Sequence, residues 1–569
     1  MTDSVFLFSS ATGVPERWFS GYAFAGRDFI ADAGGAQRYR TAIGGEIPIG
    51  EDGCYVTIAP QGEATVIGAD FKGYKHLYYY SEGGVWAFSN SLLALVQHLR
   101  EQGVALRIDR AQLMAWGHPK PFTAQPASFD TAVCDIYILP SFYCLELVDH
   151  QLRPVALPRP EPMTYPQALK QYLELWLARI AALVEHGGLS LMADLTGGRD
   201  SRALLGFFLA VRERQGDGQG MDNVYLRANR AERLAADLEV AQALAGHYGL
   251  PLNRKMPRPP PLAAHHAYQD WKALCLGIYT PVYFPYTLNS PRHIYFGGGG
   301  GESHRPFYPL MAPAQYLRAK QKGFADEALV TRWHQQVLAS LKTLQQHNPA
   351  DIHPLILHYR EFRDRFHVGR TLQYTTMCAP LGSRWLMACS DVCHREALES
   401  NQILFDIMEN LAPGLSRHPF DEAYKSPTAE NLARLTRVAL DEPLAAGRVY
   451  IGEKENTQDT GEATGQQRIT LLRDDMARRR EDIQAAGIDA AEIAAILARL
   501  DGAIEKGHFH HASEGRRAAW LLLAGELHHW IGRYDDDRPG MDATSPAELK
   551  SPGVGGVRGL WQALKRRCQ

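Results

Sequence analysis

The segment from Leu189 to Arg202 reads LSLMADLTGGRDSR. Its apolar run stops at two glycines and a helical pattern follows, which predicts a strand, a tight turn and the start of a helix. Gly197 and Gly198 allow the backbone to come close to an anion. Thr196 and Ser201 add hydroxyl donors, and the helix N-terminus adds unpaired N–H groups. The turn is therefore predicted to bind phosphate.

Asp200 places a carboxylate in the same turn. A carboxylate repels phosphate unless a divalent cation lies between them, so Asp200 favours Mg²⁺-bound nucleotide over a bare anion. The common P-loop pattern G-x-x-x-x-G-K-[ST] is absent from the sequence. A short glycine motif can also be an ordinary strand-to-helix turn, so other segments must agree with this interpretation.

Two later segments repeat the pattern of a strand followed by a special turn. Residues 224–228 predict a second short strand, and residues 232–248 predict the helix after it. Residues 294–296 predict a third strand, which runs into five consecutive glycines at 297–301 and then Glu302. Each glycine costs roughly 1 kcal/mol against alanine in a regular element. We therefore expect this run where backbone approaches a ligand rather than where it packs.

The turn at 196–201 resembles the Ser-Gly-Gly-x-Asp-Ser pyrophosphatase loop of the asparagine synthetase family, with Thr196 in place of the first serine. The following strands and Glu302 come in the same order as in that family. The alignment within the glycine run can shift by one residue. The resemblance implies ATP and Mg²⁺ as cofactors, and Asp200 and Glu302 as the metal ligands. The expected ATP-binding residues are Leu195, Thr196, Gly197, Gly198, Asp200, Ser201, Leu226, Gly299 and Gly300.

Two basic residues are candidates for catalysis. Arg305 follows Glu302 by three residues and is expected to face phosphate. The family has a late lysine that stabilises the adenylate, and Lys425 is the nearest candidate here, with Lys454 behind it. β-Lactam synthetases of the family use a Tyr-Glu dyad, but Gly299 stands where the tyrosine would be expected. The arginines at 360, 363 and 365 either face a triphosphate or form a helix salt-bridge face.

The N-terminal part resembles the glutaminase domain of the same family. Strands are predicted over 52–58, 66–70, 75–80 and 85–90, joined by turns. A working glutaminase carries Cys directly after the initiator Met, with its own α-amino group as base. Here that residue is Thr2, and Cys54 lies in mid-strand without a free amino group. We therefore predict a domain that is inactive towards glutamine.

The resemblance implies a protein of mixed α/β and α+β class. Residues 1–152 form an Ntn-hydrolase-like β-sandwich with helices, a degenerate glutaminase-like domain. Residues 153–164 are predicted to be a proline-rich linker. Residues 165–534, which begin with an amphipathic helix over 165–185, form the ATP-binding synthetase domain. This domain is a doubly wound parallel sheet of the PP-loop ATP pyrophosphatase type with a helical extension. Residues 535–569 are predicted to be a flexible tail.

Composition limits the functional classes. The chain has 569 residues and a formal net charge of -3, which gives no electrostatic case for nucleic acid. No apolar stretch reaches the roughly 20 residues of a membrane span. Eight irregularly spaced cysteines indicate reduced thiols, so a cytoplasmic location without nucleic-acid or membrane partners is expected. Zinc at Cys389, Cys393 and His394 is disfavoured because no second Cys/His pair has suitable spacing.

These features together predict an ATP-dependent, AMP-forming amide ligase that does not hydrolyse glutamine. It would adenylate a small-molecule or peptide carboxylate and join it to an amine, with other proteins of a biosynthetic pathway as partners. Relatives without the nucleophilic cysteine, β-lactam synthetases and lasso peptide cyclases, close lactam or macrolactam rings. Two alternatives stay open. One is amidation of a small or sugar acid with free ammonia, and the other is a non-catalytic binding or assembly protein that retains the fold.

Overall fold

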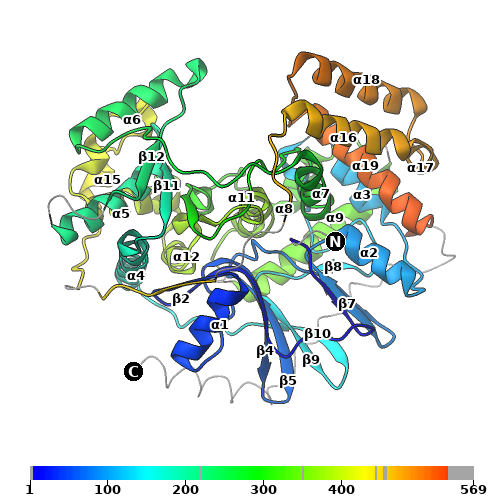
Figure 1. Cartoon of the computed structure of the whole chain (residues 1–569), viewed down its shortest axis with the longest axis horizontal. Helices are drawn as coiled ribbons and strands as arrows, with labels where there is room; N and C mark the ends of the chain where they lie inside the picture. Colours follow the sequence, from blue (N-terminus) through cyan, green and yellow to red (C-terminus); the bar gives the residue numbers. More distant parts are fainter. Residues whose placement is uncertain are drawn as a thin grey trace.

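A computed structural model describes residues 4–118, 120–216, 221–324, 326–348, 351–441, 445–452 and 458–535. The protein is a mixed α/β structure with two mainly antiparallel sheets and one parallel sheet. Figure 1 shows the antiparallel strands below, the parallel sheet at the upper left and a group of late helices at the upper right.

The N-terminal part is built from two sheets. One has the order β1-β7-β6-β8 and the other β10-β9-β5-β4-β2-β3-β15. The strands are β1 (Leu7–Ser9), β2 (Trp18–Ala25), β3 (Asp28–Ala31), β4 (Gly53–Gln61), β5 (Ala64–Ala69), β6 (Tyr78–Glu82), β7 (Val85–Ser89), β8 (Tyr137–Ile138), β9 (Tyr143–Val148), β10 (Gln151–Ala156) and β15 (Val449–Ile451). Three helices accompany them, α1 (Asp32–Ile43), α2 (Leu92–Glu101) and α3 (Arg110–Gly117). The four predicted strands are confirmed as β4 to β7.

The two sheets share an apolar core. Alternate residues of β4, Val56 and Ile58, belong to one buried cluster with Trp86 and Phe88 of β7 in the other sheet. This is the pattern expected of a sandwich, because side chains alternate between the two faces of a strand. A sandwich with helices is therefore present in the N-terminal part.

Strand β10 corrects the predicted linker. Residues 153–156 are part of this strand and pair with β9, with Pro154 opposite Leu145. The strand forms the edge of its sheet, where a proline without an N–H group breaks no ladder. The connecting segment is thus shorter than residues 153–164. The chain also returns to this sheet from the second half, because β15 pairs parallel to β3.

The parallel sheet has the order β12-β11-β13-β14, and each neighbouring pair is parallel. Its strands are β11 (Ser190–Asp194), β12 (Val224–Arg227), β13 (His293–Phe296) and β14 (Met377–Cys378). The first three confirm the predictions, whereas β14 is two residues long and was not predicted. The helices α4 (Tyr165–Glu185), α5 (Arg199–Gln215) and α6 (Ala235–His247) precede or follow these strands. Because β11 and β13 are parallel neighbours, the turns after them lie at one edge of the sheet.

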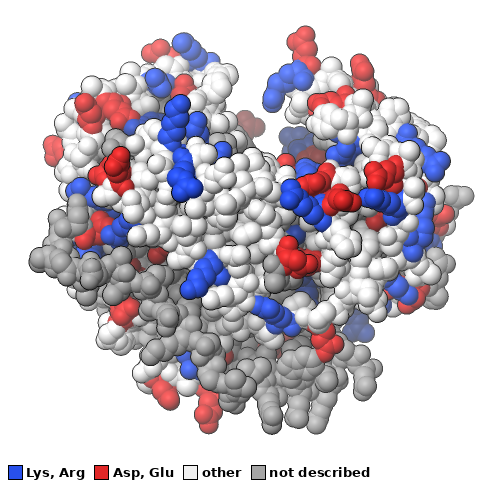
Figure 2. Space-filling view, turned by 180° about the vertical axis from the view of Figure 1, so that it is seen from behind, with Lys and Arg blue, Asp and Glu red and all other residues white. Residues whose placement is uncertain are grey.

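The other elements described in the second half are mainly helices, as predicted for the helical extension. They include α7 (Ala264–Cys275), α8 (Pro313–Lys320), α9 (Glu327–His347), α10 (Pro354–His358), a π-helical segment (Tyr359–Asp364), α11 (Arg365–Leu372), α12 (Arg384–Asp391), α13 (Arg395–Glu399), α14 (Gln402–Leu411), α15 (Ala429–Ala433), α16 (Gly465–Arg478), α17 (Arg480–Ala485), α18 (Ala490–Lys506) and α19 (Glu514–Ile531). Within the described residues, no helix has the length and apolarity that a membrane crossing requires. Acidic and basic side chains are interspersed over the face drawn in Figure 2.

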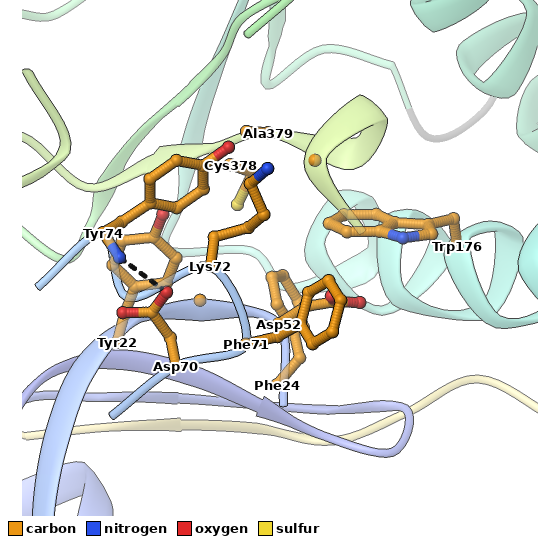
Figure 3. A pocket seen from close by; sticks show the side chains of 12 residues that line it. Tyr22, Phe24, Asp52, Asp70, Phe71, Lys72, Tyr74, Trp176, Cys378 and Ala379 are labelled. Atoms are coloured by element: carbon orange, nitrogen blue, oxygen red, sulfur yellow. Dashed lines mark hydrogen bonds between the residues drawn. The ribbon is translucent and has the colours of Figure 1, made fainter. Parts of the chain in front are cut away.

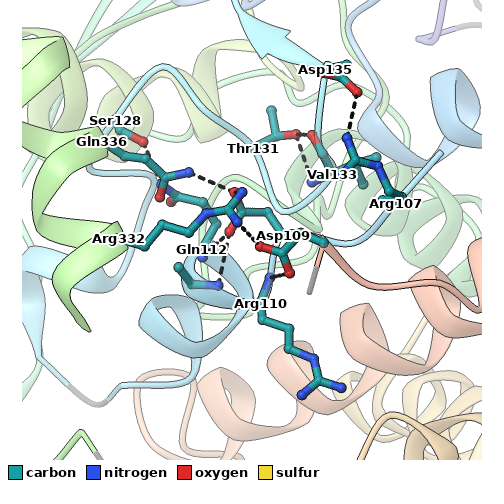
Figure 4. Close-up of polar contacts among 12 residues, drawn as sticks. Arg107, Asp109, Arg110, Gln112, Ser128, Thr131, Val133, Asp135, Arg332 and Gln336 are labelled. Atoms are coloured by element: carbon teal, nitrogen blue, oxygen red, sulfur yellow. Dashed lines mark hydrogen bonds and ion pairs between the residues drawn. The ribbon is translucent and has the colours of Figure 1, made fainter. Parts of the chain in front are cut away.

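A polar network ties the end of the described chain to the N-terminal part (Figure 4). Asp109 caps α3 by accepting the N–H groups of Ala111 and Gln112, and its second oxygen accepts a 2.7 Å hydrogen bond from Gln336 of α9. Arg332 of α9 pairs with both Asp109 and Asp535. Asp535 is therefore anchored, which moves the start of the predicted tail; residues 536–569 lie outside the described residues.

Three buried histidines predict the acid stability of the fold. Burial lowers the pKa of His76 and His304 to about 3 and that of His358 to about 4. Unfolded histidines titrate near 6.5, so below that pH the unfolded chain binds more protons and stability falls as pH decreases. These three groups alone would lower the free energy of unfolding by about 4 kcal/mol per pH unit between about pH 6 and pH 4.5. Burial also raises the pKa of Asp70 and Asp130 to about 6, and these two carboxyls offset up to about 2.7 kcal/mol per pH unit over the same range. Thermal scans at pH 7, 6 and 5 should therefore show a small net fall in the melting midpoint, and a rise would contradict this account.

Candidate functional site

The predicted phosphate turn lies between β11 and α5, and its own hydroxyls hold it closed. Ser201 Oγ accepts the N–H of Thr196 at 3.1 Å and lies 2.9 Å from Thr196 Oγ1. Thr196 Oγ1 in turn accepts the N–H of Gly198 at 3.1 Å. The hydroxyls of Thr196 and Ser201 were expected to face phosphate, and they also define the shape of the turn.

A carboxylate from α6 already binds one N–H group of this turn. Asp237 Oδ1 accepts the N–H of Gly197 at 2.8 Å. No pattern in the sequence points to Asp237, because it lies forty residues away inside an ordinary helical pattern. The contact shows that the backbone of the turn can bind an anionic oxygen, and a phosphate on the Gly197 N–H has to displace the Asp237 carboxylate.

Asp200, Glu302 and Arg305 come together at the edge of the sheet, as predicted. Arg305 Nη2 lies 3.5 Å from Asp200 Oδ2 and 3.5 Å from Glu302 Oε1, so one guanidinium bridges the two carboxylates. Tyr359 of the π-helical segment donates a 2.8 Å hydrogen bond to Glu302 Oε2. Gly299 stands where the sequence led us to expect the dyad's tyrosine, whereas Tyr359 reaches Glu302 from 57 residues away.

The charge state of this group follows from its burial. Desolvation raises the pKa of Asp200, the Arg305 guanidinium opposes the rise, and the Glu302 carboxylate adds to it. Desolvation alone would lower the pKa of Arg305, but the two carboxylates outweigh it and the pKa lies above the ordinary value. Asp200 Oδ1 is buried and has no hydrogen-bond partner among the described residues. An oxygen in this state fits a Mg²⁺ ligand, because Mg²⁺ prefers carboxylate oxygen.

Lys425 lies beside the same turn. Its Nζ pairs with Asp421 Oδ2 at 2.5 Å, and a Cβ added to Gly197 would lie 2.4 Å from the Asp421 side chain. Burial lowers the pKa of Lys425, but the hydrogen bond and charge of Asp421 outweigh it and the pKa is raised. The lysine therefore stays protonated. Arg199 of α5 holds this segment by donating to the carbonyl oxygens of Tyr424 and Lys425.

The glycine run corrects one expectation, because two of its members are required by packing. A Cβ on Gly300 would lie 2.3 Å from the backbone nitrogen of Gly382, and Gly300 has φ +92°. A Cβ on Gly299 would lie 2.7 Å from the Val368 side chain. Gly298 and Gly301 are the members that lie against Asp200, since a Cβ on Gly301 would lie 2.6 Å from Asp200 Oδ1 and one on Gly298 would lie 3.0 Å from Asp200 Cβ. The glycines let the chain after β13 pass close to Val368, to Gly382 and to Asp200.

The two leucines expected beside adenine have buried side chains. Leu195 and Leu226 are 1% and 4% exposed and belong to the main core. The N–H of Leu195 donates to the carbonyl oxygen of Arg227 at 2.8 Å, which joins the ends of β11 and β12. Any ligand contact of these residues is therefore restricted to backbone atoms.

The arginines of the π-helical region and α11 hold structure together, which favours the salt-bridge interpretation. Arg365 pairs with Glu361 and donates to the carbonyl oxygens of Gly73 and Leu139. Arg360 pairs with Asp391 and donates to the carbonyl oxygen of Ser303. These contacts connect Gly73, in the turn after β5, and Ser303, next to Glu302, to the π-helical segment and α11.

The N-terminal part also reaches this site directly through Lys72. Its Nζ pairs with Asp364 at 2.7 Å and lies 3.4 Å from Ser303 Oγ. No sequence pattern predicts this contact, because it joins residues more than 200 positions apart. Nearby, Asp70 accepts the N–H groups of Tyr74 and Lys75 and so fixes the turn that carries Lys72 (Figure 3).

A cavity beside Lys72 is too small for a nucleotide. It has a volume of about 10 Å³ and is lined by Tyr22, Phe24, Asp52, Gly53, Asp70, Phe71, Lys72, Tyr74, Trp176, Cys378, Ala379 and Gly382 (Figure 3). A ligand pocket usually has at least about 300 Å³, whereas this space holds about one water molecule. It marks the contact between the sandwich and the helical half.

The remaining sequence expectations fall outside the site. Cys54 lies inside β4, and burial raises its pKa far above the ordinary value, as expected of an inert thiol. Cys389 and Cys393 form no metal-ligand group with His394 among the described residues. Thr2 and Lys454 lie outside the described residues. No protein-family model matches the chain, and no curated protein matches it.

Proposed function

We propose that this protein is an ATP-dependent, AMP-forming amide ligase similar to asparagine synthetases, one that works without glutamine. The proposal includes an Ntn-hydrolase-like sandwich that has lost its nucleophile and a PP-loop type of ATP-binding sheet. One observation carries it: adjacent parallel strands bring Asp200 and Glu302 to a single guanidinium, 3.5 Å from each. Open α/β sheets bind ligands at the carboxyl ends of their strands, which is where these residues lie.

The chain's own residues fit both cofactors. Asp200 and Glu302 would hold Mg²⁺, and the unpartnered Asp200 Oδ1 supports this assignment. When bound, Mg²⁺ neutralises charge on the phosphate oxygens of an in-line displacement. The Gly197 N–H would bind phosphate in place of the Asp237 carboxylate. Arg305, released from part of its bridge, would then face the phosphates.

The reaction that suits this arrangement has two steps. A substrate carboxylate oxygen attacks the α-phosphorus of ATP, and the bond to pyrophosphate breaks. An amine nitrogen then attacks the acyl carbon, AMP leaves with the electron pair of the C–O bond, and the amine gives up one proton. Lys425 stays protonated beside Asp421 and the turn, so it would stabilise the negative charge of the adenylate rather than act as a base.

Product analysis tests this proposal. The full-length protein is incubated with ATP, Mg²⁺ and a small-molecule extract of its producer, in the absence of glutamine. We expect AMP and pyrophosphate in equal amounts, and no change in rate when glutamine is added. Release of ADP and phosphate would contradict the proposed chemistry, and a glutamine-dependent rate would contradict the inactive glutaminase.

A further inference from the structure

A second group of ligating side chains lies away from the candidate active site. Among the described residues, His265, His266 and Asp459 are the one set of three or more His, Cys, Asp or Glu side chains whose ligand atoms lie within 4.8 Å of one another. The histidines lie in the first turn of α7, and Asp459 lies in the segment before α16. Nothing in the proposed ligase reaction uses these residues.

Backbone pairing fixes this group. The N–H of Ala263 donates to the carbonyl oxygen of Asp459 at 3.1 Å, and the N–H of Gly461 donates to that of Pro261 at 3.1 Å. Leu262 and Thr460 form an antiparallel bridge between these two bonds. The main chain therefore places the carboxylate opposite the start of α7, where the two imidazole rings lie with their centroids 4.1 Å apart.

The distances within the group fit a metal better than a hydrogen bond. The Nε2 atoms of His265 and His266 each lie 3.5 Å from Asp459 Oδ2. A hydrogen bond between such atoms would be about 2.7 to 3.2 Å long. In a tetrahedral site with bonds of about 2.1 Å, neighbouring ligand atoms lie about 3.4 Å apart. Each imidazole Nε2 already has that separation from the carboxylate oxygen.

From this geometry we propose that His265, His266 and Asp459 bind one divalent transition-metal ion, with Zn²⁺ the best fit. Two imidazoles and one carboxylate are typical Zn²⁺ ligands, whereas Mg²⁺ prefers an all-oxygen set. Their side chains are 50%, 22% and 74% exposed, so the ion can enter from solvent.

The fourth coordination position has space beside it. His266 lines a cavity of about 510 Å³ together with residues of α2, α7 and α19, among them Gln269, Lys272 and Trp530. Three protein ligands and one open position are the arrangement of catalytic rather than structural zinc sites. The ion would therefore carry water or a small ligand at the mouth of this cavity.

Co²⁺ binding tests the proposal. The chelator-treated full-length protein, kept in excess Mg²⁺ to occupy oxygen-ligand sites, is titrated with Co²⁺ while visible absorption is followed. We expect one equivalent of Co²⁺ to produce the strong visible absorption of four-coordinate Co²⁺. Added Zn²⁺ should displace the Co²⁺ and remove this absorption. His266→Ala and Asp459→Asn should each weaken binding by at least about 100-fold.

The matched controls are His508→Ala and Asp501→Asn, which remove exposed groups of the same kinds elsewhere and should leave the titration unchanged. Far-UV circular dichroism checks that each variant is folded, and His265→Ala supplies a third ligand variant. The proposal fails if the wild-type protein shows only the weak spectrum of aqueous Co²⁺. It also fails if the ligand variants titrate like the wild type.

Discussion

Asp200→Asn and Glu302→Gln should each lower the rate of pyrophosphate release from ATP by at least about 100-fold. Each change removes one carboxylate of the pair bridged by Arg305, and with it several kcal/mol of charge stabilisation. The loss should come without loss of fold. Burial raises the pKa of Asp200, so the charged carboxylate is held at a cost at neutral pH, and the asparagine variant should melt no lower than the wild type.

Asp501→Asn is the control for these two variants. Asp501 of α18 forms a half-exposed surface pair with Arg473 of α16, far along the chain from the sheet. Its loss should change neither the rate nor the melting midpoint. Near-normal turnover in Glu302→Gln, with Asp200→Asn inactive, would mean that another residue is the second acidic ligand.

Gly300→Ala should unfold or strongly destabilise the protein. Its φ of +92° is unfavourable for any residue with a Cβ, and that Cβ would lie 2.3 Å from the Gly382 backbone, which cannot move as a side chain can. Strain of this kind costs about 1 to 3 kcal/mol before any collision. We expect a melting midpoint several degrees lower and loss of nucleotide turnover through misfolding.

Gly246→Ala supplies the comparison. Gly246 lies in α6 with open space where a Cβ would be, and alanine is favoured over glycine inside a helix. This variant should be as stable as the wild type or more so. If Gly300→Ala melts like the wild type but fails to bind ATP, the glycine is required for the ligand and not for packing.

Local patterns were enough to predict the sheet edge. The strands at 190–194, 224–227 and 293–296 each have an apolar run that ends at a turn, and parallel pairing brings those turns together. The resemblance to the asparagine synthetase family led us to expect Asp200 and Glu302 together, and Arg305 was expected from its place after the glycine run. The structure brings the three side chains together because each follows its strand closely, so little chain separates the pattern from the position.

Contacts between distant segments could not be predicted. Tyr359 reaches Glu302 from a π-helical segment, and Lys72 reaches Ser303 from the N-terminal sandwich. A single sequence holds no periodicity that reports which helix packs on which turn. Strand β15 has only three residues, and its pairing with β3 depends on the fold of the whole second half.

Calorimetric titration of the wild-type protein with ATP shows whether the turn after β11 binds the nucleotide. We expect saturable binding of ATP in the presence of Mg²⁺, weakened by at least about 10-fold in Asp200→Asn and unchanged in Asp501→Asn. A flat titration of the wild-type protein, with Mg²⁺ and substrate extract present, would contradict the ligase and favour a binding protein that retains only the fold.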